Sequence, residues 1–367
     1  MTRMMTASLG LAALLGSTTL VSAQSMEALI EGAKKEGSLT TIALPHSWCG
    51  YGDVIAGFKA KYPFLTINEL NPDAGSADEL EAVRANKTNK GPQAPDVLDV
   101  GLAFGPAAQG EGLLAPFKVS TWDTIPADAK DADGHWYGDY YGVMSMLVNT
   151  DLVDNVPKSF ADLLKPEYAG QVALTGDPRT SNQAILAVMA AGIARGAEPG
   201  KAAAEAGLQF FKELNDAGNF VPVTGRAGTL AQGTTPILIA WDYNALAWRD
   251  GLKGNPPAEV IVPSDATLAG VYVQAISAYA PQPNAAKLWM EYLYSDEGQL
   301  GWLKGYCHPI RFNDLVAKGS VPKELLDALP PADAYERAVF PSIAQVNANK
   351  EAVVAGWDKV VGANVVD

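Results

Sequence analysis

Leu39–Leu44 reads L-T-T-I-A-L, and similar short apolar runs return as L-T-I-N-E-L at Leu65–Leu70 and D-V-L-D-V-G at Asp96–Gly101. Runs of this length and composition are typical of buried strands. The segments between them, Gly52–Lys61 and Ser76–Asn86, are long enough for one helix each. Strands that alternate with helices predict an α/β fold, in which ligands bind at the carboxyl ends of the strands.

The rest of the chain predicts a second unit of the same class. A chain of 367 residues exceeds what one hydrophobic core usually supports. Extended runs at Tyr140–Val148 and Tyr272–Ala278 border a middle segment, and we expect them to be two hinge strands. We therefore expect a two-lobed clamp of doubly wound sheets, with 24–143 and 273–367 in the first lobe and 144–272 in the second. The middle segment itself predicts a helix at Asn182–Ala194 and strands at Pro236–Ala240 and Glu259–Val262.

The N-terminus predicts a secretory signal peptide, residues 1–23. Arg3 precedes a run of small and apolar residues, Ala7–Val21, and Val21-Ser22-Ala23 has the small residues of a signal-peptidase site. The run is too short to span a bilayer, and no cysteine follows it as a lipidation site. We expect cleavage after Ala23 and a soluble periplasmic protein; a buried N-terminal helix is the alternative.

Composition excludes several classes of partner. The chain is 48 % hydrophobic and 19 % charged, as ordinary globular proteins are, and its formal net charge is −14. An acidic surface repels phosphate backbones and anionic lipids, so binding to nucleic acid or to a membrane surface is not expected. Acidity also favours solubility, and we expect a monomer.

Two cysteines, Cys49 and Cys307, are the only ones in the chain. In an oxidising compartment an even pair predicts a disulfide. Free thiols are one alternative. A tetrahedral zinc site is another, because His46 and His308 flank the same two cysteines.

Four longer motifs resemble a known family. In chain order they are G-F-K-A-K-Y-P (Gly57–Pro63), A-P-D-V (Ala94–Val97), S-F-A-D-L-L-K-P-E-Y-A-G-Q-V (Ser159–Val172) and P-N-A-A-K-L-W-M-E-Y-L-Y-S-D-E-G-Q (Pro283–Gln299). Their order resembles the extracellular solute-binding proteins of ABC importers, the family that includes ferric-iron, thiamine, phosphonate and polyamine binders. The resemblance implies the type II periplasmic binding fold, a ligand in the cleft between the lobes, and hinge closure. It also implies docking onto ABC permease subunits in the inner membrane that work with a cytoplasmic ATPase.

One departure from the family concerns iron. Ferric binders carry paired tyrosines after a strand of the second lobe, where this chain reads Trp241-Asp242-Tyr243-Asn244 with a single tyrosine. Tyr140 and Tyr141 are adjacent, but alternation along a strand points them to opposite faces. Ferric iron is therefore not the expected ligand.

Candidate ligand contacts fall on loops and helix starts. Ser47, Trp48 and Tyr51 follow the first predicted strand, where aromatic rings suit stacking on a ligand; local packing by the disulfide is the alternative. Ser76 stands in a Gly-Ser turn before a helix. Arg179, Thr180 and Ser181 precede the helix at Asn182–Ala194 and form a candidate anion site, or simply a capped helix with a solvated arginine.

A second set of candidates suits a cation. Asp242 between Trp241 and Tyr243 would hold an ammonium group by charge and cation–π attraction, unless Asp242 is a plain helix cap. Aromatic and acidic residues near the two crossings, Trp136, Tyr141, Asp265 and Tyr272, either contact the ligand or pack the hinge. An amine-bearing ligand, such as a polyamine or an aminophosphonate, fits both sets best. A sugar phosphate or a thiamine-like compound is the alternative.

Catalytic and cofactor motifs are absent from the sequence. It holds no G-x-S-x-G, no G-x-x-x-x-G-K-[ST] and no H-E-x-x-H, so we expect no cofactor, no metal and no enzyme activity. A periplasmic transferase or hydrolase on the same two-lobed fold is the second hypothesis, and a sensor subunit that feeds a membrane receptor is the third.

Overall fold

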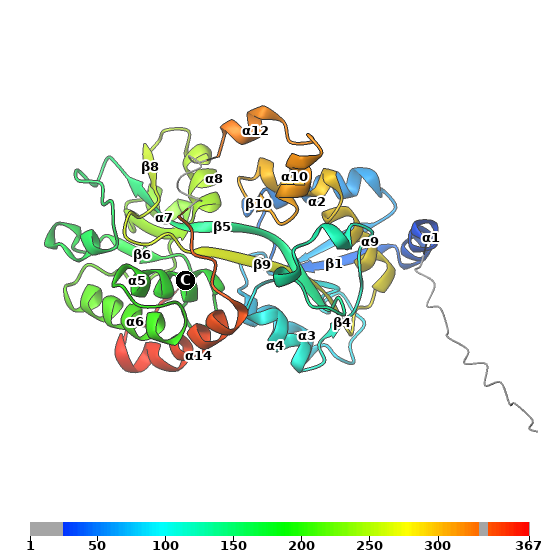
Figure 1. Ribbon diagram of the computed structural model, residues 1–367, viewed down its shortest axis with the longest axis horizontal. Coiled ribbons are helices and arrows are strands. Elements are labelled where there is room, and N and C mark those ends of the chain that lie inside the picture. Colours follow the sequence, from blue (N-terminus) through cyan, green and yellow to red (C-terminus); the bar gives the residue numbers. More distant parts are fainter. Residues whose placement is uncertain (1–24, 330–336, 367) are drawn as a thin grey trace, which may run out of the picture.

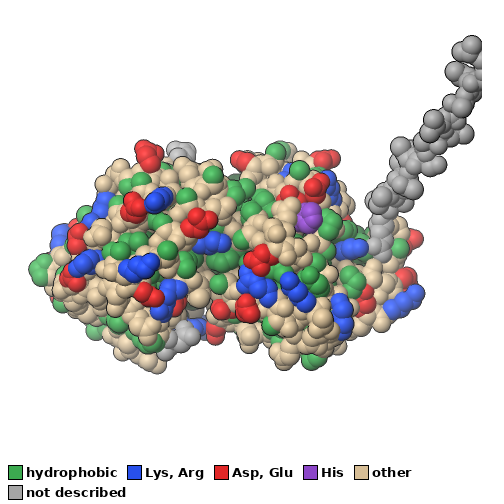
Figure 2. All heavy atoms as spheres, turned by 90° about the horizontal axis from the view of Figure 1, so that it is seen from below, with side chains coloured by type: hydrophobic (Ala, Val, Ile, Leu, Met, Phe, Trp, Pro, Cys, Tyr) green, Lys and Arg blue, Asp and Glu red, His purple; other side chains and the backbone are tan. Residues whose placement is uncertain are grey.

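The computed structural model describes residues 25–329 and 337–366. The predicted signal peptide, residues 1–23, lies outside the described residues. The described chain forms two α/β lobes joined by long strands (Figure 1). None of its helices combines the length and the apolar composition that a membrane span requires. Acidic and basic side chains are interspersed over the face shown in Figure 2.

The first lobe is built around the three predicted N-terminal strands. β1 (Ser38–Ile42) and β2 (Thr66–Leu70) pair in parallel, and the N–H of Asp96, just before β3 (Val97–Gly101), donates to the carbonyl of Thr40 in β1 at 2.9 Å. The remaining elements of this lobe are α1 (Met26–Glu36), α2 (Tyr51–Lys61), α3 (Ser76–Ala85), α4 (Phe104–Gly110), β4 (Leu114–Ala115), α9 (Pro283–Leu293), α10 (Asp296–Lys304), β10 (His308–Pro309), α11 (Phe312–Ala317) and α12 (Lys323–Asp327).

The second lobe packs an apolar helix against a sheet. α5 (Asn182–Ala194) has the predicted bounds and is buried along almost its whole length, as expected of a helix that is apolar all round. α6 (Lys201–Asp216) crosses it closely: a Cβ at Gly207 would lie 1.9 Å from the carbonyl oxygen of Val188, so only glycine allows this approach. The other elements are β6 (Val172–Leu174), α7 (Ala227–Ala231), β7 (Ile237–Trp241), α8 (Asp242–Leu252) and β8 (Ala258–Ile261).

Two antiparallel strands pass from lobe to lobe, as predicted. β5 (Trp136–Asn149) pairs with β9 (Ala269–Ser277), with a register shift between Gly138 and Tyr141. At its other end β5 pairs with β7 and β8 of the second lobe, while β9 pairs with β3 of the first. The hinge is therefore continuous with both sheets (Figure 1).

A third crossing corrects the predicted lobe division. Val339 bridges to Leu268 beside β9, and the chain then enters α14 (Ile343–Val360), which packs on α5 and α6. The ring of Trp357 in α14 is fully buried, 5.6 Å from that of Phe211 in α6. The prediction that assigned all of 273–367 to the first lobe is wrong for α14, because its apolar side chains are buried against the second lobe.

The cysteines form the predicted disulfide. Cys49 and Cys307 are joined with their Cα atoms 5.3 Å apart, and both are fully buried. The bond ties the loop after β1 to the turn after α10. The two histidines of the zinc alternative have other partners: His46 is exposed beside Glu69, and the ring of His308 stacks on that of Tyr141.

Candidate functional site

A cleft of about 590 Å³ lies between the two lobes. This volume is within the range of small-molecule sites. The first lobe contributes the loops after β1 and β2, the start of α3 and Asp99 of β3. The second lobe contributes the loop between β6 and α5, the start of α7, and part of α8. The cleft therefore lies at strand ends and helix starts, as the α/β pattern predicts.

Part of the predicted ligand set lines this cleft. Ser47 and Trp48 come from the loop held by the disulfide, and Ser76 starts α3 with its hydroxyl accepting from the N–H of Gly101 at 3.1 Å. Thr180, Ser181 and Tyr272 complete this group from the second lobe and from β9. That these residues bind a ligand stays a prediction; the structure brings them together around one space.

The lobes touch across this cleft. Arg226, at the start of α7, makes an ion pair at 3.0 Å with Asp73, in the loop after β2. The carbonyl of Thr180 lies 3.5 Å from the N–H of Ala77. A Cβ at Gly101 would lie 2.0 Å from the side chain of Asn182, so any larger residue where β3 meets the start of α5 would force that side chain to move.

Buried carboxyl groups, those of Asp99 and Glu79, form one wall of the cleft, which we call the acidic wall. Asp99 in β3 and Glu79 in α3 are 5 % and 1 % exposed, and a carboxylate oxygen of Glu79 accepts from the N–H of Asp99 at 2.9 Å. Oδ2 of Asp99 accepts from the Tyr140 hydroxyl at 2.6 Å, and the same carboxyl also interacts with the side chains of Asp139 and Tyr51.

Aromatic rings surround these acids. The indole N–H of Trp48 donates to the Tyr140 hydroxyl at 2.7 Å, so Trp48, Tyr140 and Asp99 form one hydrogen-bonded chain. The ring centroid of Trp48 lies 5.4 Å from that of Tyr272 in an edge-to-face arrangement. Carboxylates beside aromatic faces can bind an organic cation by charge and by cation–π attraction.

Burial raises the pKa of three carboxyl groups here. Desolvation raises the pKa of Asp99 to about 6, and it raises the pKa of Glu79 well above its usual range, with the charge of Asp99 adding to the effect. Asp139 in β5 is fully buried behind Asp99, and burial followed by the Asp99 charge raises its pKa as well. The charged form of each acid is disfavoured because water is excluded.

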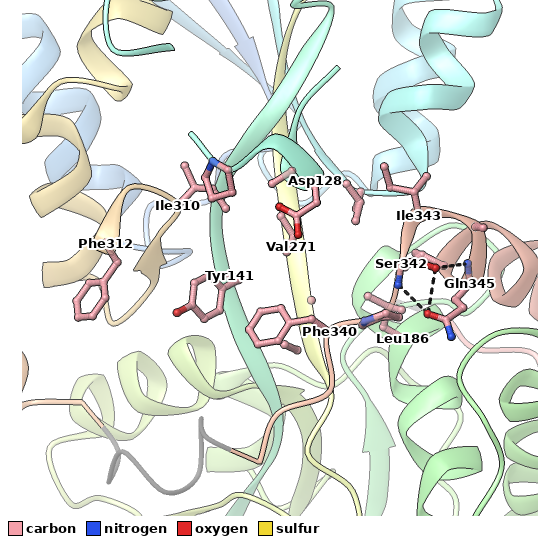
Figure 3. A pocket seen from close by; sticks show the side chains of 18 of the residues that line it. Asp128, Tyr141, Leu186, Val271, Ile310, Phe312, Phe340, Ser342, Ile343 and Gln345 are labelled. Carbon is pink, nitrogen blue, oxygen red and sulfur yellow. Dashed lines mark hydrogen bonds between the residues drawn. The ribbon is translucent and has the colours of Figure 1, made fainter. Parts of the chain in front are cut away.

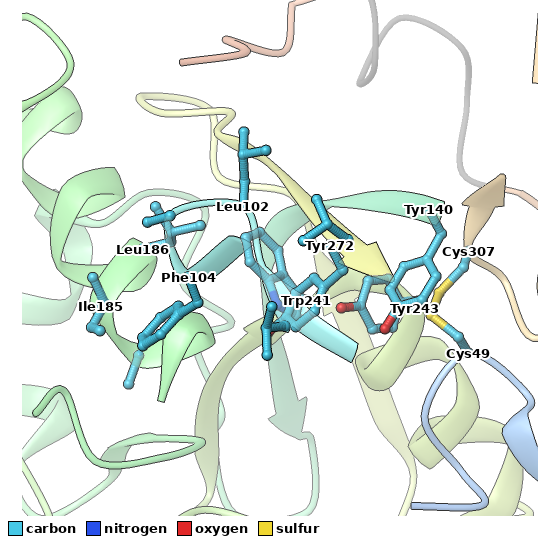
Figure 4. Close-up of a cluster of buried hydrophobic side chains, with 14 of the residues drawn as sticks. Cys49, Leu102, Phe104, Tyr140, Ile185, Leu186, Trp241, Tyr243, Tyr272 and Cys307 are labelled. Carbon is cyan, nitrogen blue, oxygen red and sulfur yellow. A yellow bond between two sulfur atoms is a disulfide. The ribbon is translucent and has the colours of Figure 1, made fainter. Parts of the chain in front are cut away.

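The residues of the predicted cation site on α8 lie outside the cleft lining. Asp242 is fully buried, and its Oδ1 accepts from the N–H of Val143 at 2.9 Å. Trp241 is fully buried against Gly270, where a Cβ would lie 2.1 Å from the indole ring. Tyr243 is also fully buried, 5.4 Å from the Trp48 ring. Figure 4 shows Trp241, Tyr243, Tyr272 and Tyr140 in one buried cluster beside the disulfide. Trp241 and Tyr243 therefore pack in the core, and Asp242 binds the main chain of the hinge strand β5.

Other predicted residues also lie away from the cleft lining. Arg179 forms a two-pronged ion pair with Asp177. Its guanidinium also donates to Asp358 and Asn364 and so links the loop before α5 to the C-terminal segment. Asp265 accepts from the N–H groups of Phe160 and Ala161 in a turn of the second lobe.

Two aromatic candidates belong to the core of the first lobe. The indole N–H of Trp136 donates to Gln109, and the side chain of Tyr51 is fully buried with its hydroxyl accepting from Gln274 at 2.8 Å.

Tyr141 lines a second cavity, of about 750 Å³ (Figure 3). Its neighbour on β5, Tyr140, contacts the cleft acids, so the expectation that adjacent tyrosines point to opposite faces is confirmed. Figure 3 shows Phe340 beside the Tyr141 ring, and the other lining side chains are mostly apolar.

The acids at the cleft were missed as ligand residues. Asp99 interrupts the apolar residues Val97–Val100 of the predicted strand, and that interruption was the signal for a buried carboxyl. Glu79 stands in the first turn of a helix, where an acid is commonplace and carries no signal. Asp73 and Arg226 lie on loops, and their pairing depends on how the lobes meet.

One group in the described residues could supply metal ligands. Asp131, Asp133 and His135 place ligand atoms within 4.8 Å of one another. Asp131 already accepts hydrogen bonds from the ring and main chain of His135 and from Gln109. These bonds explain why the three side chains lie close together in the turn at 131–135. We assign no metal to it.

Comparisons with known proteins identify relatives of the whole arrangement. Residues 93–333, more than half of the chain, match the family described as bacterial extracellular solute-binding protein. An uncharacterized protein of Haemophilus influenzae is 31 % identical over 270 residues, which cover 68 % of this chain and 70 % of that protein.

Solved structures show the fold. An ABC transporter substrate-binding protein from Bradyrhizobium japonicum superposes with a TM-score of 0.68 at 16 % identity, over 88 % of this chain and 99 % of that one. The periplasmic binding protein AfuA from Actinobacillus pleuropneumoniae, with fructose-6-phosphate bound, gives a TM-score of 0.67 at 19 % identity, over 88 % and 98 %. The predicted type II periplasmic binding fold is thereby confirmed.

Proposed function

The chain belongs to the family of bacterial extracellular solute-binding proteins, and from this membership we infer that it captures a small amine-bearing solute in the periplasm for an ABC importer. Membership supports the coarser part of this function: binding and transport, outside the cytoplasm. Cleavage after Ala23, a monomeric state, and docking onto permease subunits that work with a cytoplasmic ATPase stay predictions.

The charge of the cleft supports a cationic solute. Its lining residues include the acids Asp73, Asp78, Glu79, Asp99 and Asp177. Asp73 is paired with Arg226 and Asp177 with Arg179, which leaves Asp78, Glu79 and Asp99 as the lining acids without an ion pair among the described residues. The single observation that carries the proposal is Asp99, a buried carboxyl in the cleft lining that is joined through the Tyr140 hydroxyl to the Trp48 indole. A phosphate or a sugar phosphate would meet like charge at this wall.

The opposite wall distinguishes two kinds of amine. Thr180 and Ser181 precede α5, a helix of 13 residues, and helix starts favour anions. An aminophosphonate could place its amine at Asp99 and its acid group here, whereas a polyamine would use the acidic wall alone.

A thermal-shift panel on the mature protein tests the proposal. We expect 1,4-diaminobutane, spermidine or 2-aminoethylphosphonate to raise the melting temperature, because a ligand at a thousandfold excess over its Kd stabilises by about 4 kcal/mol. Fructose-6-phosphate and ferric salts should not. A shift with either of those and none with the amines would contradict the proposal. Recovery of one unmodified amine molecule per protein chain would support a binding protein, whereas chemical conversion of the amine would support the enzyme hypothesis.

A variant localises the binding. Asp99→Asn should weaken the binding of the active amine at least tenfold, because a charge-assisted hydrogen bond is replaced by a neutral one. Asp128→Asn is the matched control, since Asp128 is exposed and lines the second cavity. Equal loss of affinity in the two variants would contradict the assignment of the acidic wall.

A further inference from the structure

The second cavity lies on the opposite face of the hinge strands from the cleft. In β5 the side chain of Tyr141 lines the second cavity, whereas its neighbour Tyr140 donates to Asp99 in the cleft lining. In β9 Val271 lines the second cavity, and the next residue, Tyr272, lines the cleft. Because successive side chains of a strand point to opposite faces, the strand pair itself separates the two spaces.

Both lobes contribute walls to the second cavity (Figure 3). Ala129, Ile310 and Phe312 belong to the first lobe. Leu186 belongs to α5, and Val346 belongs to α14, which packs on α5 and α6 of the second lobe. A cavity with walls on both lobes changes its volume whenever the lobes rotate about the hinge strands.

The lobes are in contact across the cleft, on the other side of the hinge strands. Arg226 and Asp73 form an ion pair at 3.0 Å. The hydroxyl of Tyr306, which follows α10 in the first lobe, donates to the carboxylate of Asp250 in α8 of the second lobe. With the cleft shut in this way, the second cavity has a volume of about 750 Å³. Opening the cleft has to narrow the second cavity, because the two spaces lie on opposite sides of one hinge.

The lining of the second cavity favours an apolar occupant. The rings of Tyr141 and Phe340 lie edge to face with centroids 5.2 Å apart, and Phe340 is 52 % exposed. Asp128 is the only charged side chain among the described lining residues, and its exposure to water screens its charge. A concave apolar space of this size is the usual form of a small-molecule site. An uncharged aromatic molecule matches the lining best, because its rings and aliphatic groups pack on such a molecule and no basic side chain there attracts an anion.

We propose that the second cavity is an effector site for a small uncharged aromatic molecule, whose binding holds the cleft shut and raises the affinity for the solute. An occupant keeps the walls of the cavity apart and therefore opposes the opening of the cleft. A solute that shuts the cleft widens the cavity in turn, and each ligand must tighten the binding of the other by the same factor. This inference goes beyond the proposed function and relies on it only for the solute used in the test.

Fluorescence titration of the mature protein with the uncharged dye Nile red tests the effector site. We expect the Kd of Nile red to be at least about fivefold lower in saturating 1,4-diaminobutane than in its absence. Nile red should lower the Kd of 1,4-diaminobutane by the same factor. Absence of dye binding, or dye binding that the diamine leaves unchanged or weakens, overturns this inference and leaves the proposed function standing.

A side chain can take the place of the effector. Ala344, at the start of α14, is exposed and lines the cavity, so Ala344→Trp fills the space without entering the core. Ala355→Trp is the matched control, because Ala355 is exposed on the same helix and lines neither space. We expect Ala344→Trp to abolish Nile red binding and to lower the Kd of 1,4-diaminobutane at least about fivefold, and Ala355→Trp to change neither. Unchanged or weaker diamine binding in Ala344→Trp contradicts the coupling.

Small-angle scattering gives a measurement that does not depend on the identity of the solute. Ligand-free Ala344→Trp should have a smaller radius of gyration than the ligand-free wild-type protein, because its lobes are held together across the cleft. An equal or larger radius overturns this inference. Failure of every amine in the thermal-shift panel, with the smaller radius observed, contradicts the proposed function alone. If Ala344→Trp fails to fold, Nile red added to the wild-type protein should give the same decrease, and no decrease overturns the inference.

Discussion

The two cavities beside the hinge strands have opposite character although neighbouring residues of one strand serve both. The cleft is walled by carboxyl groups, hydroxyls and aromatic rings from strand ends and helix starts, while the second cavity is lined mostly by apolar side chains such as Leu186, Val271 and Phe312. Tyr140 is fully buried and donates to Asp99 in the lining of the cleft, whereas Tyr141 lines the second cavity. Strand alternation therefore decides which hinge residue can contact a solute in the cleft, and chemical type alone does not.

The largest effect should come from an acid that lies in the hinge rather than in the cleft. Asp242→Ala is expected to lower the free energy of unfolding by about 2–3 kcal/mol, because the buried N–H of Val143 loses its acceptor. Chemical denaturation measures this, with the exposed Asp128→Ala as control. Unchanged stability together with lost amine affinity would show that Asp242 binds the solute and does not stabilise the hinge.

A tyrosine pair tests the alternation directly. Tyr140→Phe should weaken amine binding by about tenfold, because its hydroxyl links the Trp48 indole to Asp99 and each such bond is worth about 1 kcal/mol or more. Tyr141→Phe should leave affinity unchanged. Fluorescence or calorimetric titration of both variants gives the answer, and a larger loss for Tyr141→Phe would assign the solute to the second cavity.

A smaller effect is expected at the contact between the lobes. Arg226→Gln removes the ion pair with Asp73, and exposed pairs contribute about 0–1 kcal/mol, so affinity should fall no more than a few-fold and the fall should shrink at high salt. Arg195→Gln is the matched control, because Arg195 pairs with Glu213 and neither residue lines the cleft. A loss above about tenfold for Arg226→Gln would mean that this arginine contacts the solute itself.

Local patterns determined the elements and their class. The helix at Asn182–Ala194 was predicted with its observed bounds. A long apolar run that begins after a capping residue and ends at polar residues is typical of a buried helix. The strands at Leu39–Leu44, Leu65–Leu70 and Asp96–Gly101 were found for a similar reason. The disulfide was predictable because only one pairing of two cysteines exists within the chain.

Tertiary structure decided which side chains share the cleft. The chain pattern W-D-Y-N suggested a cation site at Asp242, but β5 covers that carboxyl and leaves Asp99 and Glu79 at the cleft. It also decided that α14 belongs to the second lobe, since the chain crosses a third time after α12.

The sequence by itself therefore determined the α/β class, the family resemblance and the cysteine pair, all of which depend on neighbours in the chain or on composition. Which acids form the acidic wall and which polar candidates lie outside the cleft lining depend on contacts between residues far apart in the chain. Burial and the approach of like charges set the pKa of a carboxyl, and both arise only when α3, β3 and β5 are packed together.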